Sequence, residues 1–479
     1  MTVTPFRVPL MQDPKALYEC LAAFQVSNQA SNSNGTAIAS ISLALPKIDP
    51  LYALELLGHT TRSHFYWEHP TEAVAIAAMQ PVVRREINGS DRFIQTQRFI
   101  SEVLQRTATA GELHLPMAGP HFFCSFTFFD QPHHEPQRFP AAVAFLPQWQ
   151  VACVQGQGVL VANLPLTPTS NLTQLTDSVL EIWQRLQRRS AAYRNPFSLP
   201  LIQVPTPCLS HQTRFLEAAA ATLAQIHRGK LEKLVLSETL EVKTATPLPL
   251  APTLHKLRSR YADCQIFSLR DEQGQGFIGA SPERLLQIQD RQLTADALAG
   301  SAPRGRTVRE DVVLGDRLLN STKDIHEHQL VLSFIQQRLQ NLGIRPHATT
   351  PAHLLQLPNI QHLRTLVTAN LPSHLGLLNV LAALHPTPAV AGTPQHSVEP
   401  YLRRYEPFDR HLYAAPLGWV DYRGNGSFTV GIRSALVQGD HLRLYAGAGI
   451  VAGSDPHREW AEVRLKLQTL LQAFVDDET

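Results

Sequence analysis

The chain of 479 residues has little cysteine and no long hydrophobic run. Its five cysteines are scattered and odd in number, so they form neither the short spacings of a zinc site nor a disulfide framework. No window approaches the roughly eighteen consecutive apolar residues that cross a bilayer. The first residues also lack the charged start and apolar core of a signal peptide. We therefore expect a globular, cytoplasmic protein from a reducing compartment.

Charge of one sign is not in excess either, since 42 lysines and arginines stand against 40 acidic residues, for a formal charge of +2. A chain so balanced gives no reason to expect nucleic acid or an anionic surface as its partner. The glycine-containing segment 298–305 is not a phosphate-binding P-loop, because no Gly-Lys-Ser/Thr follows it. We expect a small-molecule substrate, no nucleic acid, no membrane, and a monomer.

Strand-like and helix-like segments alternate irregularly along the chain. The runs 121–130 and 141–147 are short, aromatic or β-branched, and bounded by Pro, Asp or Gly, as is typical of strands. Further on, 276–288 predicts two strands joined by a tight turn, whereas 310–340 and 456–474 predict long helices. Hairpin-like strands with helices grouped between them favour an α+β fold over a doubly wound parallel sheet.

A proline-rich stretch at 195–207 separates two parts of different chemical content. Residues 1–205 hold few candidate catalytic side chains, and residues 206–479 hold nearly all of them. A length of 479 residues suits two or three ordinary domains or one large composite. We expect an amino-terminal half that contributes strands and helices, and a carboxy-terminal catalytic half, within one structural unit.

Acidic side chains recur at helical spacing in two segments. Glu459, Glu462 and Lys466 follow a glycine-rich turn at spacings of three and four, so a helix places them on one face. Asp324 and Glu327 repeat the acidic spacing of three. Taken alone, each set is more often a solvated helix face with an ordinary ion pair. Together they suit a Mg²⁺ site that water and substrate oxygens complete.

Two histidines in the second acidic segment raise the alternative of a zinc site. His326 and His328 are two residues apart, and side chains at that spacing point in different directions on a helix. We therefore expect ordinary core or surface histidines there, and not metal ligands.

A lysine and a glutamate beside apolar strands are candidates for proton transfer. Lys233 opens the strand-like segment 233–242, where a snorkelling surface lysine is the ordinary interpretation. A partly desolvated lysine could instead present a neutral amine that takes a proton from water. Glu283 lies in a Gly-Ala-Ser-Pro-Glu-Arg turn, as either an ordinary hairpin acid or a general acid at the rim of a cavity.

Three further features favour a bound carboxylate. Arg433 enters a mostly apolar strand, where a guanidinium is costly to bury without an anion. Tyr413 offers a hydroxyl donor, although a packed aromatic side chain is at least an equal alternative. The segment 298–305 is expected to be a loop whose backbone amides a ligand can approach closely.

Together these motifs resemble the chorismate-utilising enzymes, and most closely the isochorismate synthases. The matching segments occur in the family's order and are 232–238, 279–285, 297–305, 321–331, 359–365, 385–394 and 447–466. They cover roughly residues 211–475, with a weaker match at 65–70 and 121–130. The resemblance implies a large α+β fold of two packed antiparallel sheets with helices outside.

The resemblance also implies a reaction, the reversible conversion of chorismate to isochorismate. Water adds to ring carbon 2 while the hydroxyl at carbon 4 leaves. Lys233 matches the family's water-activating lysine, and Glu283 matches the acid that protonates the departing hydroxyl. Glu327 and Glu462 match the Mg²⁺ ligands, with further acids near them directly or through water. These neighbours are Glu459 and Asp324, the latter at a position where family members often carry Glu.

The remaining matches are substrate-binding positions. Those near the pyruvyl group are Tyr413, Arg433, Lys466 and the amides around Gly447. Those beside the ring are Gly300 and Ser301, with His362 as a further pocket residue.

Other functions fit parts of this pattern. Anthranilate synthases use ammonia and lack the water-activating lysine, so Lys233 disfavours them. Salicylate synthases share the lysine, the acid and the Mg²⁺ site and then eliminate pyruvate, so they stay open. A catalytically silent scaffold is disfavoured, because every expected catalytic side chain is present. The destination of the product is open between menaquinone or phylloquinone biosynthesis, which 65–70 favours, and siderophore or salicylate biosynthesis.

Overall fold

The computed structural model describes residues 4–6, 13–30, 36–58, 63–136, 138–188, 209–349 and 351–474. Their 21 strands join into one branched system of hydrogen-bonded pairs, and helices α1 to α11 surround it, which confirms the predicted α+β class. The pairs among these strands are antiparallel except at one edge. There β1 (Thr4–Phe6) and β2 (Ala37–Leu45) run parallel to β5 (Thr107–Gly111).

The system divides into two antiparallel arms that share the long strand β7 (Ala142–Val154). The first arm runs from β7 through β4 (Val74–Ile87), β3 (His64–His69), β10 (Gln265–Arg270), β11 (Gln275–Ser281), β20 (Ser434–Gln438), β21 (His441–Val451) and β9 (Lys233–Lys243) to β17 (Gly392–Thr393). The second arm runs through β6 (His121–Phe126), β18 (Pro416–Asp421), β19 (Gly426–Val430), β12 (Arg284–Gln289) and β13 (Gln292–Pro303) to β16 (Ile360–Asn370). Two short strands, β14 (His347–Ala348) and β15 (His353–Gln356), pair with β16, while β8 (Gln157–Leu166) joins β7 to β2.

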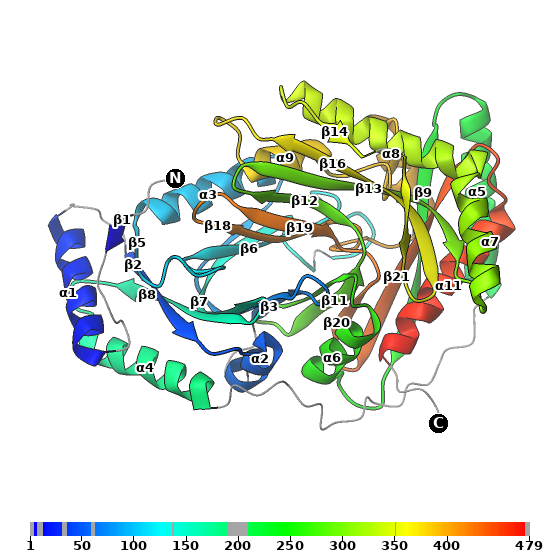
Figure 1. Cartoon of the computed structure of the whole chain (residues 1–479). Helices are drawn as coiled ribbons and strands as arrows, with labels where there is room; N and C mark the ends of the chain where they lie inside the picture. The colour runs from blue at the N-terminus through cyan, green and yellow to red at the C-terminus, as the bar shows by residue number, and fades with distance from the viewer. Residues whose placement is uncertain are drawn as a thin grey trace.

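The two arms form two layers with helices on the outside (Figure 1). On the outer side of one layer lie α3 (Arg92–Gln105), α8 (Thr322–Asn341) and α9 (Leu377–Leu384); below the other lie α2 (Pro50–Gly58) and α6 (Leu250–Arg260). The end that carries β9 and β21 is covered by α5 (Leu209–His227), α7 (Val308–Leu319) and α11 (Pro456–Phe474). The remaining helices are α1 (Pro14–Ala30), α4 (Leu172–Arg188) and α10 (Gln395–Tyr405).

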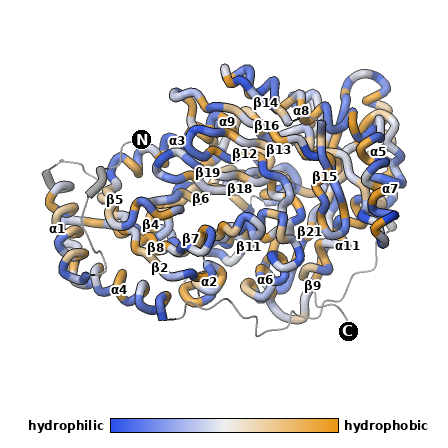
Figure 2. The backbone as a smooth tube through the Cα atoms, in the orientation of Figure 1, coloured by the Kyte–Doolittle hydropathy of each residue, from blue (hydrophilic) through white to orange (hydrophobic). Residues whose placement is uncertain are grey.

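The core lies between the layers, where strands are covered on both faces. Each residue of β18 and β19 is buried, including the polar Ser427 and Thr429, so both faces of these strands are covered. Aromatic rings link the arms, as where Phe65 of β3 lies 5.1 Å from Phe123 of β6 between ring centroids. Figure 2 shows the same distribution, with apolar colour along the central strands and polar stretches on the outer helices and loops.

Strands from the two expected halves of the chain pair directly. Tyr66 of β3 stands opposite Ser268 of β10, and Phe123 of β6 stands opposite Trp419 of β18. The proline-rich stretch and the division at 205 and 206 lie outside the described residues, so that division stays a prediction. No helix among the described residues is long and apolar enough to span a membrane.

The helices expected over 310–340 are confirmed as α7 and α8, which are separate because the Ser321 hydroxyl accepts the Asp324 amide and caps a new helix. One local prediction was wrong. Residues 298–303 of the expected loop 298–305 instead form the end of β13. It carries a bulge between Ala299 and Ser301, where Gly300 has a φ of +79°.

Candidate active site

One cavity gathers almost all of the predicted site residues. It lies where the β11–β12 turn, the end of β13, strand β21 and helices α8 and α11 meet, and it measures about 780 Å³ with its open mouth. The predicted residues that line it are Glu283, Gly300, Ser301, Asp324, Glu327, His362, Tyr413, Arg433, Gly447, Glu459, Glu462 and Lys466. The remaining one, Lys233, lies behind Glu327.

Lys233 is fully buried at the start of β9, so its interpretation as a snorkelling surface residue is wrong. Its Nζ lies 2.8 Å from Oε1 of Glu327. Burial would raise the pKa of Glu327, but the Lys233 ammonium opposes this strongly enough that the pKa is lowered. Gly449 on β21 makes room for the pair, since a Cβ there would stand 2.5 Å from Glu327 Oε1 and 2.8 Å from Lys233 Cε. A buried ion pair therefore stands against the wall of the cavity.

Glu283 is held firmly in the turn between β11 and β12. Its carbonyl accepts the amide of Val430 at 3.1 Å and the hydroxyl of Thr429 at 2.6 Å. Only 3% of its surface is exposed, and burial raises its pKa to about 8, with a further rise from the charge of Asp296 and an opposing effect from Lys233. The carboxyl group therefore carries a proton at neutral pH and can donate it into the cavity.

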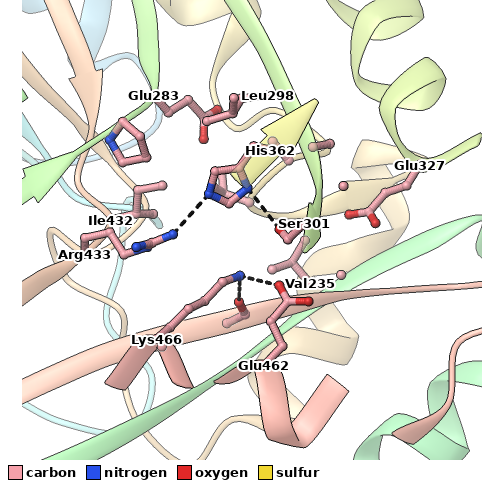
Figure 3. Close-up of a pocket in the computed structure, with 18 of the residues that line it drawn as sticks. Val235, Glu283, Leu298, Ser301, Glu327, His362, Ile432, Arg433, Glu462 and Lys466 are labelled. Atoms are coloured by element: carbon pink, nitrogen blue, oxygen red, sulfur yellow. Dashed lines mark hydrogen bonds and ion pairs between the residues drawn. The ribbon is translucent and has the colours of Figure 1, made fainter. Parts of the chain in front are cut away.

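The four acids at helical spacing face the cavity from two helices. Asp324 and Glu327 come from α8, and Glu459 and Glu462 come from α11. Figure 3 shows Glu327 and Glu462 on different sides of the cavity, with Glu283 on a third. The predicted helices thus bring both acidic faces to one place.

Lysines balance these acids. Lys323 Nζ lies 2.5 Å from Glu459 Oε1, and Lys466 Nζ lies 2.6 Å from Glu462 Oε1. Lys466 also donates to the carbonyl of Gly447 at 2.8 Å, which ties α11 to β21 beneath the cavity. Lys323 is a cavity residue that the sequence analysis missed, although it stands four residues before Glu327 on the same helix face.

The acids fit an open Mg²⁺ site and not a closed protein cage. In the described part of the chain, no three or more His, Cys, Asp or Glu side chains stand together closely enough to enclose a cation. Asp324 is nevertheless near enough to its fellow acids that, after burial, the charges of Glu327 and Glu462 add to the rise of its pKa. Mg²⁺ usually takes only one or two carboxylates and fills the other positions with water and substrate oxygens.

A chain of polar contacts runs along the opposite wall (Figure 3). Arg433 Nη2 lies 3.1 Å from His362 Nε2, and His362 Nδ1 lies 3.0 Å from Ser301 Oγ. Burial, then the charges of Arg433 and Lys466, hold the pKa of His362 well below its ordinary value. A neutral imidazole can accept from Arg433 and donate to Ser301, which fixes the guanidinium beside the cavity.

Arg433 does not lie in a strand, so that prediction was wrong. It occupies the connection between β19 and β20 with a φ of +50°, and its carbonyl accepts the amide of Ala280 at 3.0 Å. Tyr413 is a packed aromatic side chain, since its ring stacks on Tyr445 at 5.0 Å between centroids, and it also lines the cavity. Its role as a hydroxyl donor to a ligand stays a prediction.

The two histidines of α8 are a core and a surface residue, as expected. His328 is buried and its Nε2 lies 2.8 Å from the hydroxyl of Thr365, whereas His326 is exposed. Neither lines the cavity.

Comparison with known proteins identifies the family of the chain. The family model described as chorismate binding enzyme matches residues 24–475. The chain belongs to this family. Within it, the salicylate biosynthesis isochorismate synthase of Pseudomonas aeruginosa is 31% identical over 466 residues, covering 96% of this chain and 95% of the relative. Isochorismate synthase MenF of Bacillus subtilis is 27% identical over 458 residues, covering 93% of this chain and 95% of the relative.

Solved structures agree with this membership. The structure of MenF, the menaquinone-specific isochorismate synthase from Escherichia coli, matches with a TM-score of 0.75 at 25% identity, covering 95% of this chain and 99% of that chain. Anthranilate synthase component I from Streptococcus pneumoniae TIGR4 shares the fold, with a TM-score of 0.65 at 17% identity over 84% of this chain and 92% of that chain. The resemblance inferred from the motifs is thereby confirmed at the level of family and fold.

Proposed function

We propose that this chorismate-binding enzyme is a Mg²⁺-dependent isochorismate synthase that works through Lys233 and Glu283. The observation that carries the proposal is the buried Glu283, which keeps its proton at neutral pH at a cavity lined by two acidic helix faces, with the buried Lys233 behind Glu327. Relatives along nearly the whole chain are named isochorismate synthases, in agreement with this chemistry.

In the proposed reaction, one side chain accepts a proton and another donates one. The oxygen of water forms a bond to ring carbon 2, the bond between carbon 4 and its hydroxyl breaks, and the ring double bonds shift. Lys233 must first release the ammonium proton that pairs it with Glu327. As a neutral amine it then takes the proton that the water loses, and Glu283 gives its proton to the departing hydroxyl. Two separate groups, one acid and one base, make a covalent intermediate unnecessary.

The substrate carries two carboxylates, and the cavity offers positive charge for both. Arg433, held by His362, and Lys466 suit the pyruvyl carboxylate, with the Tyr413 hydroxyl and the amides around Gly447 nearby. Mg²⁺, held by Glu327 and Glu462 with Asp324 and Glu459 beside them, would supply positive charge to the ring carboxylate. Gly300 and Ser301 are proposed to lie beside the ring.

For the product, we propose delivery to menaquinone or phylloquinone biosynthesis. Support comes from the Bacillus subtilis and Escherichia coli MenF proteins, which match over 93% and 95% of this chain. The Pseudomonas aeruginosa relative of salicylate biosynthesis matches over 96% and favours the alternative destination. Expression in two bacterial mutants decides between them, one lacking its menaquinone-specific isochorismate synthase and one lacking its siderophore-specific enzyme. Rescue of menaquinone content alone is the expected result.

The activity itself is tested by an NMR time course of the purified protein with chorismate, with Mg²⁺ or with a chelator. We expect isochorismate to approach a stable mixture with chorismate only when Mg²⁺ is present. Accumulation of pyruvate and salicylate would instead assign the chain as a salicylate synthase. No conversion under either condition would refute the proposed activity and leave the family membership intact.

A further inference from the structure

A buried acid lies directly behind the turn that carries Glu283. Asp296 belongs to β13 and is only 4% exposed, although its neighbours in that strand are apolar. Its carboxylate faces the backbone N–H of Arg284, the residue after Glu283, and this opposes the rise in its pKa that burial causes. Asp296 lines a second cavity together with three residues of the turn, Ser281, Pro282 and Arg284, and it does not line the first cavity. The acid therefore supports the turn from outside the first cavity.

Arg364 holds Asp296 in this position. Arg364 Nη2 lies 3.0 Å from both carboxylate oxygens of Asp296. Arg364 stands on β16 opposite Leu298, whereas Leu366 stands opposite Asp296. A long side chain such as that of Arg364 can reach diagonally to a residue two positions from its direct partner. Burial raises the pKa of Asp296, and Arg364 opposes this by favouring the ionised form.

Two charged groups in the described part of the chain shift the pKa of Glu283 in opposite senses. The charge of Asp296 adds to the rise in the pKa of Glu283 that burial causes, whereas the charge of Lys233, from β9, counteracts it. A site that combines a buried lysine with a protonated acid needs such a balance, because the charge of the lysine alone would favour loss of the proton from the acid.

We propose that Asp296, held by Arg364, is a positioning residue for the general acid: it fixes the turn of Glu283 and places a negative charge behind it that offsets Lys233. This inference rests on the proposed role of Glu283 and adds a residue that does not touch the cavity. Nothing in the motifs of the chain pointed to it except one acid in an apolar strand.

The test separates the charge of Asp296 from its hydrogen bond. Asp296→Asn removes the charge but keeps an oxygen that can accept the Arg284 amide. We expect the midpoint of the alkaline limb of the pH–rate profile for chorismate to fall by about one pH unit. Asp296→Glu keeps the charge, and its midpoint is expected to return towards that of the unsubstituted protein. The same midpoint in all three proteins, or a uniform loss of rate at every pH, would overturn the proposal.

A matched control removes a similar ion pair elsewhere. Asp49 binds Arg258 through both oxygens at 2.9 and 2.7 Å, beside α2 and away from the cavity. Asp49→Asn should lower the melting temperature without moving the midpoint of the pH–rate profile.

A second measurement does not depend on turnover. The titration of Glu carboxyl groups labelled with ¹³C, assigned by the loss of one signal in Glu283→Gln, reports the pKa of Glu283 in the free protein. We expect a lower value in Asp296→Asn than in the parent, and an unchanged value would overturn the proposal. If the parent protein fails to convert chorismate, the proposed function fails, but this titration still decides whether Asp296 acts on Glu283.

Discussion

The ammonium of Lys233 lies 2.8 Å from Oε1 of Glu327, and their side chains are only 1% and 11% exposed. The proposed base is therefore also half of a buried ion pair with a proposed metal ligand. Removing one member of such a pair leaves the other charge buried without compensation. Loss of activity in a variant that only lacks the Lys233 side chain would not by itself show that the lysine moves a proton.

Two substitutions of Lys233 separate these roles. Lys233→Ala should lower turnover by roughly 10²- to 10⁴-fold and lower the free energy of unfolding by about 3–5 kcal/mol. Lys233→Arg keeps the positive charge opposite Glu327, but a guanidinium does not release its proton. It should recover much of the stability in urea denaturation and none of the turnover. Turnover retained by either variant would refute the assignment of Lys233 as the base.

Glu283 should make stability and rate depend on pH in a defined direction. Its pKa is raised from 4.5 to about 8 in the folded state, so the folded protein binds the proton more tightly than the unfolded chain. Its contribution to stability is therefore complete below about pH 4.5 and is lost as the pH rises towards 8. Glu283→Gln should flatten this part of the curve of unfolding free energy against pH.

The pH dependence of turnover should also follow the titration of Glu283. Conversion of chorismate requires the protonated acid, so turnover of the parent protein should fall as the pH rises through about 8. Glu283→Gln, which cannot donate a carboxylic proton, should be inactive across the whole range. An unsubstituted protein with constant turnover from pH 6 to 10 would contradict the assignment of Glu283 as the acid.

The elements of the site were largely predictable because local pattern decides them. The helical spacing of Glu459, Glu462 and Lys466 places their side chains on one face of a helix. That helix, α11, runs from Pro456 to Phe474, the predicted bounds. The turn that holds Glu283 followed from two apolar strands around a Ser-Pro-Glu sequence. Such features depend on neighbours in the chain, which a sequence shows directly.

Features that arise from tertiary contacts were not predictable. The complete burial of Lys233 depends on its pairing with Glu327 and on the space left by Gly449, which are far away in the sequence. The positive φ of Arg433 likewise belongs to the connection between two paired strands. The antiparallel arms that share β7 reflect pairings between distant segments, which only the resemblance to a family suggested.

Removal of the metal should abolish turnover and lower thermal stability together. Mg²⁺ added to the protein without substrate should raise the melting temperature, because an ion that binds only the folded state stabilises it. Glu327→Gln and Glu462→Gln should each weaken Mg²⁺ binding at least roughly tenfold in calorimetric titration. Glu217→Gln, which alters an exposed acid of α5, is the control and should leave Mg²⁺ affinity unchanged. Equal affinity in all four proteins would show that the acids of the cavity do not hold the ion.

Gly449 should tolerate no side chain, since even one methyl group reaches the Lys233–Glu327 pair. A Cβ at 2.5 Å from Glu327 Oε1 forces the carboxylate or β21 to move, so Gly449→Ala should lower the free energy of unfolding by about 1–3 kcal/mol. Because that displacement also disturbs Lys233, turnover should fall by more than the lost stability explains, as measured at a temperature where the variant is fully folded. Gly276→Ala is the matched control: it also lies in a strand of the first arm, and its Cβ would find its nearest neighbours at 3.6 Å. Parental turnover in Gly449→Ala, alongside parental turnover in the control, would show that the exact placement of the ion pair does not matter for the reaction.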